Sequence, residues 1–106
     1  MTSRDLSGDN QIVAITQARA AALVALTTAA AGDSLCTISR ERLPLAKYHE
    51  GAVAALGEAL RAARAGRTPP DASTWGAQWQ GRADVDTAWR AYLLGGRDAL
   101  VGLARV

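Results

Sequence analysis

Few side chains in this sequence are suited to catalysis or metal binding, and their spacing matches no complete reactive set. His49 is the only histidine, so it is the only group that could act as a base at neutral pH with an ordinary pKa. Ser34 and Cys36 are the candidate nucleophiles, but the sequence assigns neither of them a base or a metal partner. One cysteine and one histidine also cannot complete a four-ligand zinc site. We therefore predict a protein that is not an enzyme and that has no catalytic residue, metal or cofactor.

The segment that holds Ser34 and Cys36 also resembles a DNA-binding motif. Residues 31–40 read AGDSLCTISR, which is similar to the turn and recognition helix of helix-turn-helix regulators. The resemblance implies that four polar residues would face the DNA groove: Ser34, Thr37, Ser39 and Arg40. Asp33 replaces a buried apolar residue of that motif, and Pro44 would end its helix early. A DNA-binding regulator is therefore an alternative function.

Length and composition favour one small, mostly helical domain. The chain has 106 residues, which is enough for a single domain. Hydrophobic residues make up 49%, but 24 of them are alanine and none is phenylalanine. Alanine is the best helix former, yet it buries little apolar surface. We expect thin, closely packed helices, for which association with another chain would supply additional burial.

The charge pattern and the single cysteine argue against several kinds of partner. The net charge is +2, and the basic residues are scattered rather than clustered as in a nucleic-acid-binding tail. A single cysteine fits a reducing compartment. Residues 20–31 resemble the apolar part of a signal peptide, but Asp5 and Asp9 offset the flanking arginines. This stretch is also shorter than the roughly 20 apolar residues that span a bilayer. We expect a cytoplasmic protein without a membrane partner or sequence-specific nucleic-acid binding.

The first predicted helix covers about residues 10–31 and has two contrasting faces. A rotation of 100° per residue places six residues on one apolar stripe: Ile12, Ile15, Ala22, Leu23, Leu26 and Ala30. Arg19 falls within this stripe, so its guanidinium either reaches water past small neighbours or pairs with an acid across an interface. The other face is almost entirely alanine and includes Ala25. A helix without a polar face is usually covered on more than one side.

The second predicted helix, residues 44–65, has the clearest boundaries. Pro44 suits the first helical position, and Gly66 suits the position that follows the last turn. Glu58 precedes Arg61 by three residues, so the two side chains are placed to pair.

The connection between these helices has two interpretations. Residues 35–40 alternate as in a short strand, and a charged turn at Arg40, Glu41 and Arg42 could lead to a second strand at residues 43–45. One turn of helix is the competing interpretation.

The last third contains two predicted helices, residues 71–80 and 84–104. Trp75 and Trp79 are four residues apart and share a face of the first, and Trp89 belongs to the apolar stripe of the second. These tryptophans either fill the core or form an exposed anchor for a partner. Small residues recur every four positions in the second helix, so a neighbouring backbone could approach that edge closely: Ala91, Gly95 and Ala99.

Together, these elements predict a mainly α fold. We expect a small bundle of three to four helices, with a short β-hairpin between the first two as one alternative. The chain would form a single domain, residues 1–106, with core helices over about 10–66 and a tryptophan-containing helical region over about 71–106. The expected helix content is above about 60%, compared with the usual third.

The element order of residues 12–66 is similar to that of the small head-to-tail joining proteins of tailed phages. An alanine-rich helix, a short strand, a charged turn and a second helix would follow one another in both. The resemblance implies a non-enzymatic ring component between portal and tail, located in the virion. It also implies that Arg40, Glu41 and Arg42 lie at the hairpin tip, where neighbouring subunits meet.

We therefore expect a non-enzymatic assembly component that forms homo-oligomers or binds other structural proteins. A phage connector is the most specific version. The alternatives are the helix-turn-helix regulator and a helical bundle that binds a small molecule at its tryptophans. The candidate interface residues are Arg19, Ala25, Arg40, Glu41, Arg42, Trp75, Trp79 and Trp89.

Overall fold

The computed structural model describes residues 3–31 and 40–105, with side chains from residue 10 onward. The described residues form four helices and no strand: α1 (Ser3–Ala30), α2 (Leu43–Arg64), α3 (Ala72–Ala83) and α4 (Thr87–Ala104). The prediction of a mainly helical bundle is therefore confirmed. The first helix begins about seven residues earlier than its apolar pattern indicated, and α4 begins about three residues later than expected.

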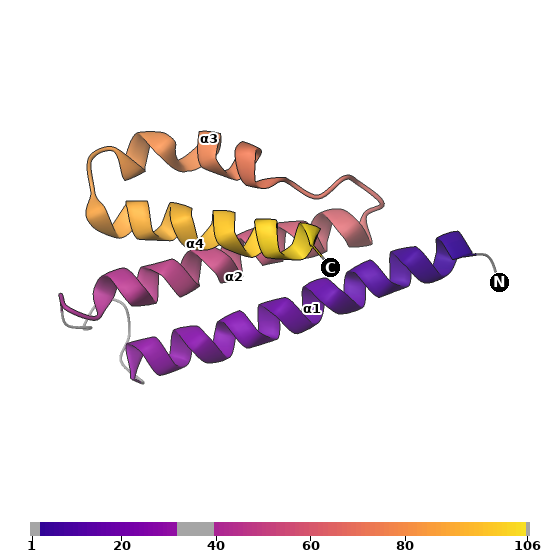
Figure 1. The fold of residues 1–106 in the computed structure, drawn as a ribbon, viewed down its shortest axis with the longest axis horizontal. Coiled ribbons are helices and arrows are strands. Elements are labelled where there is room, and N and C mark those ends of the chain that lie inside the picture. Colours follow the sequence, from indigo (N-terminus) through magenta and orange to yellow (C-terminus); the bar gives the residue numbers. More distant parts are fainter. Residues whose placement is uncertain (1–2, 32–39, 106) are drawn as a thin grey trace.

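The four helices follow one another across the molecule in the order α3, α4, α2, α1 (Figure 1). The central pair is α2 and α4, and α3 packs on the far side of α4. Helix α1 lies at the opposite edge, where it packs mainly on α2 and extends beyond the rest of the bundle. Consequently the molecule is elongated, with dimensions of 51 × 29 × 21 Å.

The short β-hairpin expected between the first two helices is not supported. Residues 43–45 form the first turn of α2 instead of a second strand. Pro44 explains this, because its fixed φ suits the first turn of a helix and it lacks the N–H that a strand ladder would need. The first strand was expected at residues 35–40, and all of these except Arg40 lie outside the described residues.

Two glycines allow α2 and α4 to pack at backbone distance. A Cβ atom at Gly51 would overlap with the carbonyl group of Tyr92, and a Cβ atom at Gly95 would overlap with the carbonyl group of Tyr48. The small-residue edge predicted in the last helix is thus used within the chain at Gly95. A hydrogen bond from the Tyr48 hydroxyl to Asp98 Oδ2, 2.6 Å long, joins the same two helices.

The helix ends follow local signals in the sequence. The side chain of Asp71 accepts a hydrogen bond from the Thr74 amide at the start of α3, and Asp86 does the same for Ala88 at the start of α4. After α2, Gly66 has a φ of +72°, in the left-handed region that glycine adopts without strain.

Candidate functional site

The aromatic residues of α3 and α4 form one cluster, and Trp75 is its innermost member. The Trp75 side chain is fully buried, packs against Gly96 and donates a hydrogen bond from Nε1 to the carbonyl oxygen of Leu93, 3.0 Å away. Its ring stacks on Tyr92 with centroids 5.5 Å apart. Trp75 therefore fills the core and is not exposed to a partner.

Trp79 and Trp89 form the half-buried outer part of this cluster. Their rings are nearly parallel, with an interplanar angle of 6° and centroids 5.4 Å apart. Lys47 Nζ lies 4.7 Å from the centroid of Trp89, and the guanidinium carbon of Arg82 lies 4.8 Å from the same ring. Both distances are within the range of cation–π attraction. The chain's own cations thus occupy positions where a cationic ligand would otherwise bind.

Two glutamates of α2, Glu50 and Glu58, influence the charges around the aromatic cluster. Glu50 Oε1 lies 3.4 Å from Lys47 Nζ, while Glu50 Oε2 is buried without a hydrogen-bond partner among the described residues. Burial raises the pKa of the Tyr92 hydroxyl, and the charges of Glu50 and Glu58 act in the same direction. Tyr92 consequently stays protonated at neutral pH and is unsuited to act as a general base.

The charged turn before α2 contributes to the packing of α1. Residues 40–42 form a turn, in which Arg40 and Glu41 are exposed. Arg42 is half-buried, and its Nη1 donates a hydrogen bond to the carbonyl oxygen of Ala30, 3.2 Å away. This carbonyl belongs to the last turn of α1, where the helix itself provides no donor. Arg42 therefore joins the end of α1 to the start of α2.

One side of α1 is exposed and uncharged. It comprises Val13, Thr16, Ala20, Leu23, Val24 and Thr27, which we call the outer face of α1. Val13 is 52% exposed and Val24 is 67% exposed. By length and composition the stretch Asn10–Ala30 could cross a membrane, and little of it is buried inside the protein. This combination distinguishes α1 from the core helix of a soluble domain, which would be mostly buried.

The alanine face predicted for α1 lies partly against the rest of the molecule, although Ala21 is exposed. Ala14, Ala18 and Ala21 line an apolar groove of about 320 Å³ whose other wall comes from α2 and α4, including Leu56 and Ala99. Ala29 is buried, and Ala25 is half-buried. Leu23, in contrast, is exposed although the periodicity placed it on the packed stripe. The packed side of α1 is thus centred between the two predicted faces.

Arg19 is half-buried at the contact between α1 and α2. Its side chain lies over Gly57, and its Nε is buried without a hydrogen-bond partner in the described part of the chain. The pairing expected between Glu58 and Arg61 does not form, since neither residue makes an ion pair among the described residues. Arg61 instead extends toward the same glycine as Arg19.

The residues considered for catalysis do not converge where the structure describes them. His49 is half-buried and makes an edge-to-face contact with its neighbour Tyr48, with ring centroids 5.3 Å apart. Ser34 and Cys36 lie outside the described residues. In the described part of the chain, no three metal-ligating side chains of the His, Cys, Asp and Glu types come together.

Comparisons of the chain with protein-family models, curated proteins and solved structures find no match. The candidate site must therefore be judged on its own geometry. Of the predicted interface residues, only the tryptophans come together, and Arg19 and the turn at residues 40–42 lie elsewhere. The contacts of Lys47 with Trp89 and of Arg42 with Ala30 join residues that are distant in the sequence, so no local sequence pattern could have identified these two contacts.

Proposed function

We propose that the protein is a non-enzymatic assembly component that associates through the outer face of α1. The observation that supports this most directly is that the face is exposed and uncharged over its whole length. Arg19 is the one charged residue among residues 10–31, and it lies on the side that packs on α2. Contiguous exposed apolar surface on a soluble protein usually marks an interaction site.

A protein partner accounts for this face better than a bilayer does. Arg19 lies near the middle of the apolar stretch Asn10–Ala30. In a membrane-spanning helix this position would be close to the bilayer centre, where an arginine costs about 2.5–3.5 kcal/mol or more. In a protein interface the same arginine can remain against α2 while the opposite side of α1 is covered.

We propose a second copy of this chain as the occupant. An uncharged face can meet its own copy without bringing like charges together, and two-fold interfaces use the same surface twice. The outer face runs from Val13 to Thr27, so two copies could pack along about 21 Å. Such a contact would supply the apolar burial that an alanine-rich chain lacks.

Light scattering of the full chain over a range of concentrations tests this proposal. The wild-type mass should be a multiple of 11.0 kDa. Val24→Glu should reduce the mass to that of one chain, because association would bury an unpaired charge. Val85→Glu is the matched control, since Val85 is 85% exposed and lies outside α1. This control should keep the wild-type mass, and both variants should keep their helical circular dichroism.

Two further experiments, vesicle flotation and DNA footprinting, distinguish this proposal from membrane association and from DNA binding. A wild-type chain that remains at 11.0 kDa and floats with lipid vesicles would replace the proposal with membrane association of α1. A reproducible footprint on duplex DNA that Arg40→Ala weakens would favour the helix-turn-helix regulator. We expect neither result.

The phage connector remains the most specific version of the proposal. Its support is the order of an alanine-rich helix, a charged turn and a second helix, now without the second strand of the hairpin. A ring-forming connector needs head-to-tail contacts rather than a two-fold contact and should give a mass of many subunits, whereas a simple dimer would favour a different assembly. The small-molecule alternative loses support because the chain's own rings and cations fill the tryptophan cluster.

A further inference from the structure

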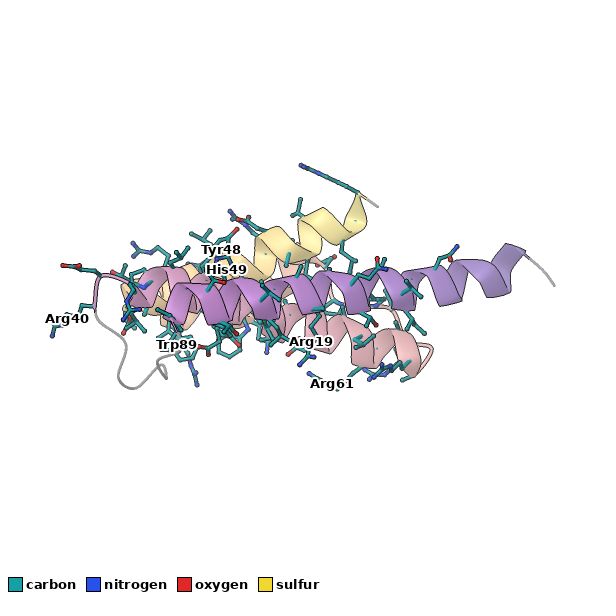
Figure 2. All side chains as sticks on the ribbon, turned by 90° about the horizontal axis from the view of Figure 1, so that it is seen from below. Arg19, Arg40, Tyr48, His49, Arg61 and Trp89 are labelled. Carbon is teal, nitrogen blue, oxygen red and sulfur yellow. The ribbon has the colours of Figure 1, made fainter. Side chains whose placement is uncertain are left out.

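Two guanidinium groups from different helices converge above Gly57. Arg19 extends from α1 and Arg61 from α2, and Figure 2 shows the two side chains on the same side of the molecule. Arg19 Nε lies 3.5 Å, and Arg61 Nη1 lies 3.6 Å, from the position that a Cβ atom would take at Gly57. The absence of a side chain at Gly57 leaves this space open to both of them.

The positive charges of this pair are not balanced by an acid among the residues that the structure describes. Neither arginine forms an ion pair or a hydrogen bond with another residue of the described chain. The neighbouring acid, Glu58, pairs with neither of them. Arg19 Nε is buried and has no hydrogen-bond partner, which is costly for a charged donor. Like charges that approach each other without an acid leave an unfavourable local potential.

We propose that Arg19 and Arg61 form an oxyanion-binding site over Gly57. A carboxylate or phosphate offers at least two oxygen atoms, and guanidinium groups present several N–H donors in a fixed plane that matches such oxygens. One oxyanion between the two side chains would accept a hydrogen bond from Arg19 Nε and neutralise the repulsion. Arginine keeps its charge over the whole accessible pH range, so the site is ready for an anion at neutral pH. The site does not depend on association through the outer face of α1.

The oxyanion could come from a phosphate group or from an acidic side chain, and a titration can tell them apart. The full chain, labelled with ¹⁵N, is titrated with inorganic phosphate or with acetate while sodium chloride holds the ionic strength constant. The Nε–Hε resonance of Arg19, assigned with Arg19→Lys, reports directly on the proposed donor. We expect this resonance and that of Arg61 to move along one saturable curve. Saturation by phosphate alone indicates a phosphate-bearing ligand, and saturation by both anions indicates that a carboxylate also fits.

Two variants separate the site from general attraction of anions. Arg61→Gln removes an exposed charge and should weaken binding at least tenfold without unfolding the chain. Arg97→Gln removes an exposed arginine from α4 and should leave binding unchanged. The proposal is overturned if the Arg19 resonance shifts no more than that of Arg97, if its shift does not saturate, or if Arg61→Gln weakens binding less than tenfold.

Discussion

At the residue scale, single glycines decide whether α2 and α4 can pack. A methyl group at Gly95 would overlap with the Tyr48 carbonyl, and this contact is between two backbones. Moving α2 and α4 apart would disturb the contact of Lys47 in α2 with Trp89 in α4. In Gly95→Ala, we expect the free energy of unfolding to fall by about 1–3 kcal/mol or more, as in overpacked cores. Urea denaturation measures the change.

Gly76 provides the matched control for this substitution. It lies within α3, and no atom would meet a Cβ atom there within 4 Å. Gly76→Ala should therefore raise the free energy of unfolding by up to about 1 kcal/mol through helix propensity alone. If both variants changed the free energy of unfolding in the same direction, the result would contradict the close backbone contact between α2 and α4 at Gly95.

The hydrogen bond between Tyr48 and Asp98 stabilises the fold at neutral pH, and this contribution is lost at alkaline pH. This bond raises the pKa of the Tyr48 hydroxyl above its ordinary value of 10.0, with burial and the charge of Asp98 acting in the same direction. A raised folded-state pKa stabilises the protein below the unfolded pKa, and this stability is lost as the pH rises through the folded pKa.

Tyr48→Phe should lower the free energy of unfolding at pH 7 by up to about 1 kcal/mol, because the pair is partly exposed. The difference from the wild type should shrink above pH 10, the ordinary pKa of tyrosine. Melting curves of both proteins between neutral and strongly alkaline pH provide the comparison. A difference that stayed constant across this range would show that the hydrogen bond does not form.

At the element scale, the caps of the short helices depend on exposed carboxylates. The amide of Thr74 donates to Asp71, and this hydrogen bond lowers the pKa of the Asp71 carboxyl below 3.8. A lowered folded-state pKa means that the cap stabilises α3 above the unfolded pKa and is lost as the pH falls through the folded value. The Thr74 amide resonance should therefore titrate with a midpoint below 3.8. In Asp71→Asn the titration of the Thr74 amide resonance should disappear, although the asparagine side chain still offers this amide an acceptor. If the resonance still titrated in this variant, a group other than Asp71 would be responsible.

Sequence patterns predicted most elements because their signals are local. Pro44 and Gly66 set the ends of α2 correctly within one or two residues. The hairpin prediction was wrong at residues 43–45. Pro44 favours the first turn of a helix there, and this preference prevails over the strand-like alternation of the preceding residues. The packed side of α1 was misplaced by part of a turn, since alanine provides apolar periodicity on every side. The contacts of Arg42 with Ala30 and of Lys47 with Trp89 could not be predicted, because each brings together residues from different elements.

At the scale of the whole molecule, the bundle leaves one long helix half-covered. Helices α2, α3 and α4 contribute most of the core around the aromatic cluster, whereas α1 lies at the edge of the bundle (Figure 1). The outer face of α1 is exposed to solvent. The single arginine of residues 10–31 is held against α2 over Gly57, so the outer face keeps no charge. This arrangement is what an association surface requires, and it is the basis of the proposed function.

The accessibility of the outer face at different protein concentrations tests the central claim most directly. Hydroxyl-radical footprinting with mass spectrometry reports the oxidation of individual valine and leucine side chains without any substitution. We expect oxidation of Val13, Leu23 and Val24 to fall as the concentration rises, while Val85 between α3 and α4 reacts equally throughout. Unchanged oxidation of the three α1 residues from dilute to concentrated solution would contradict association through this face.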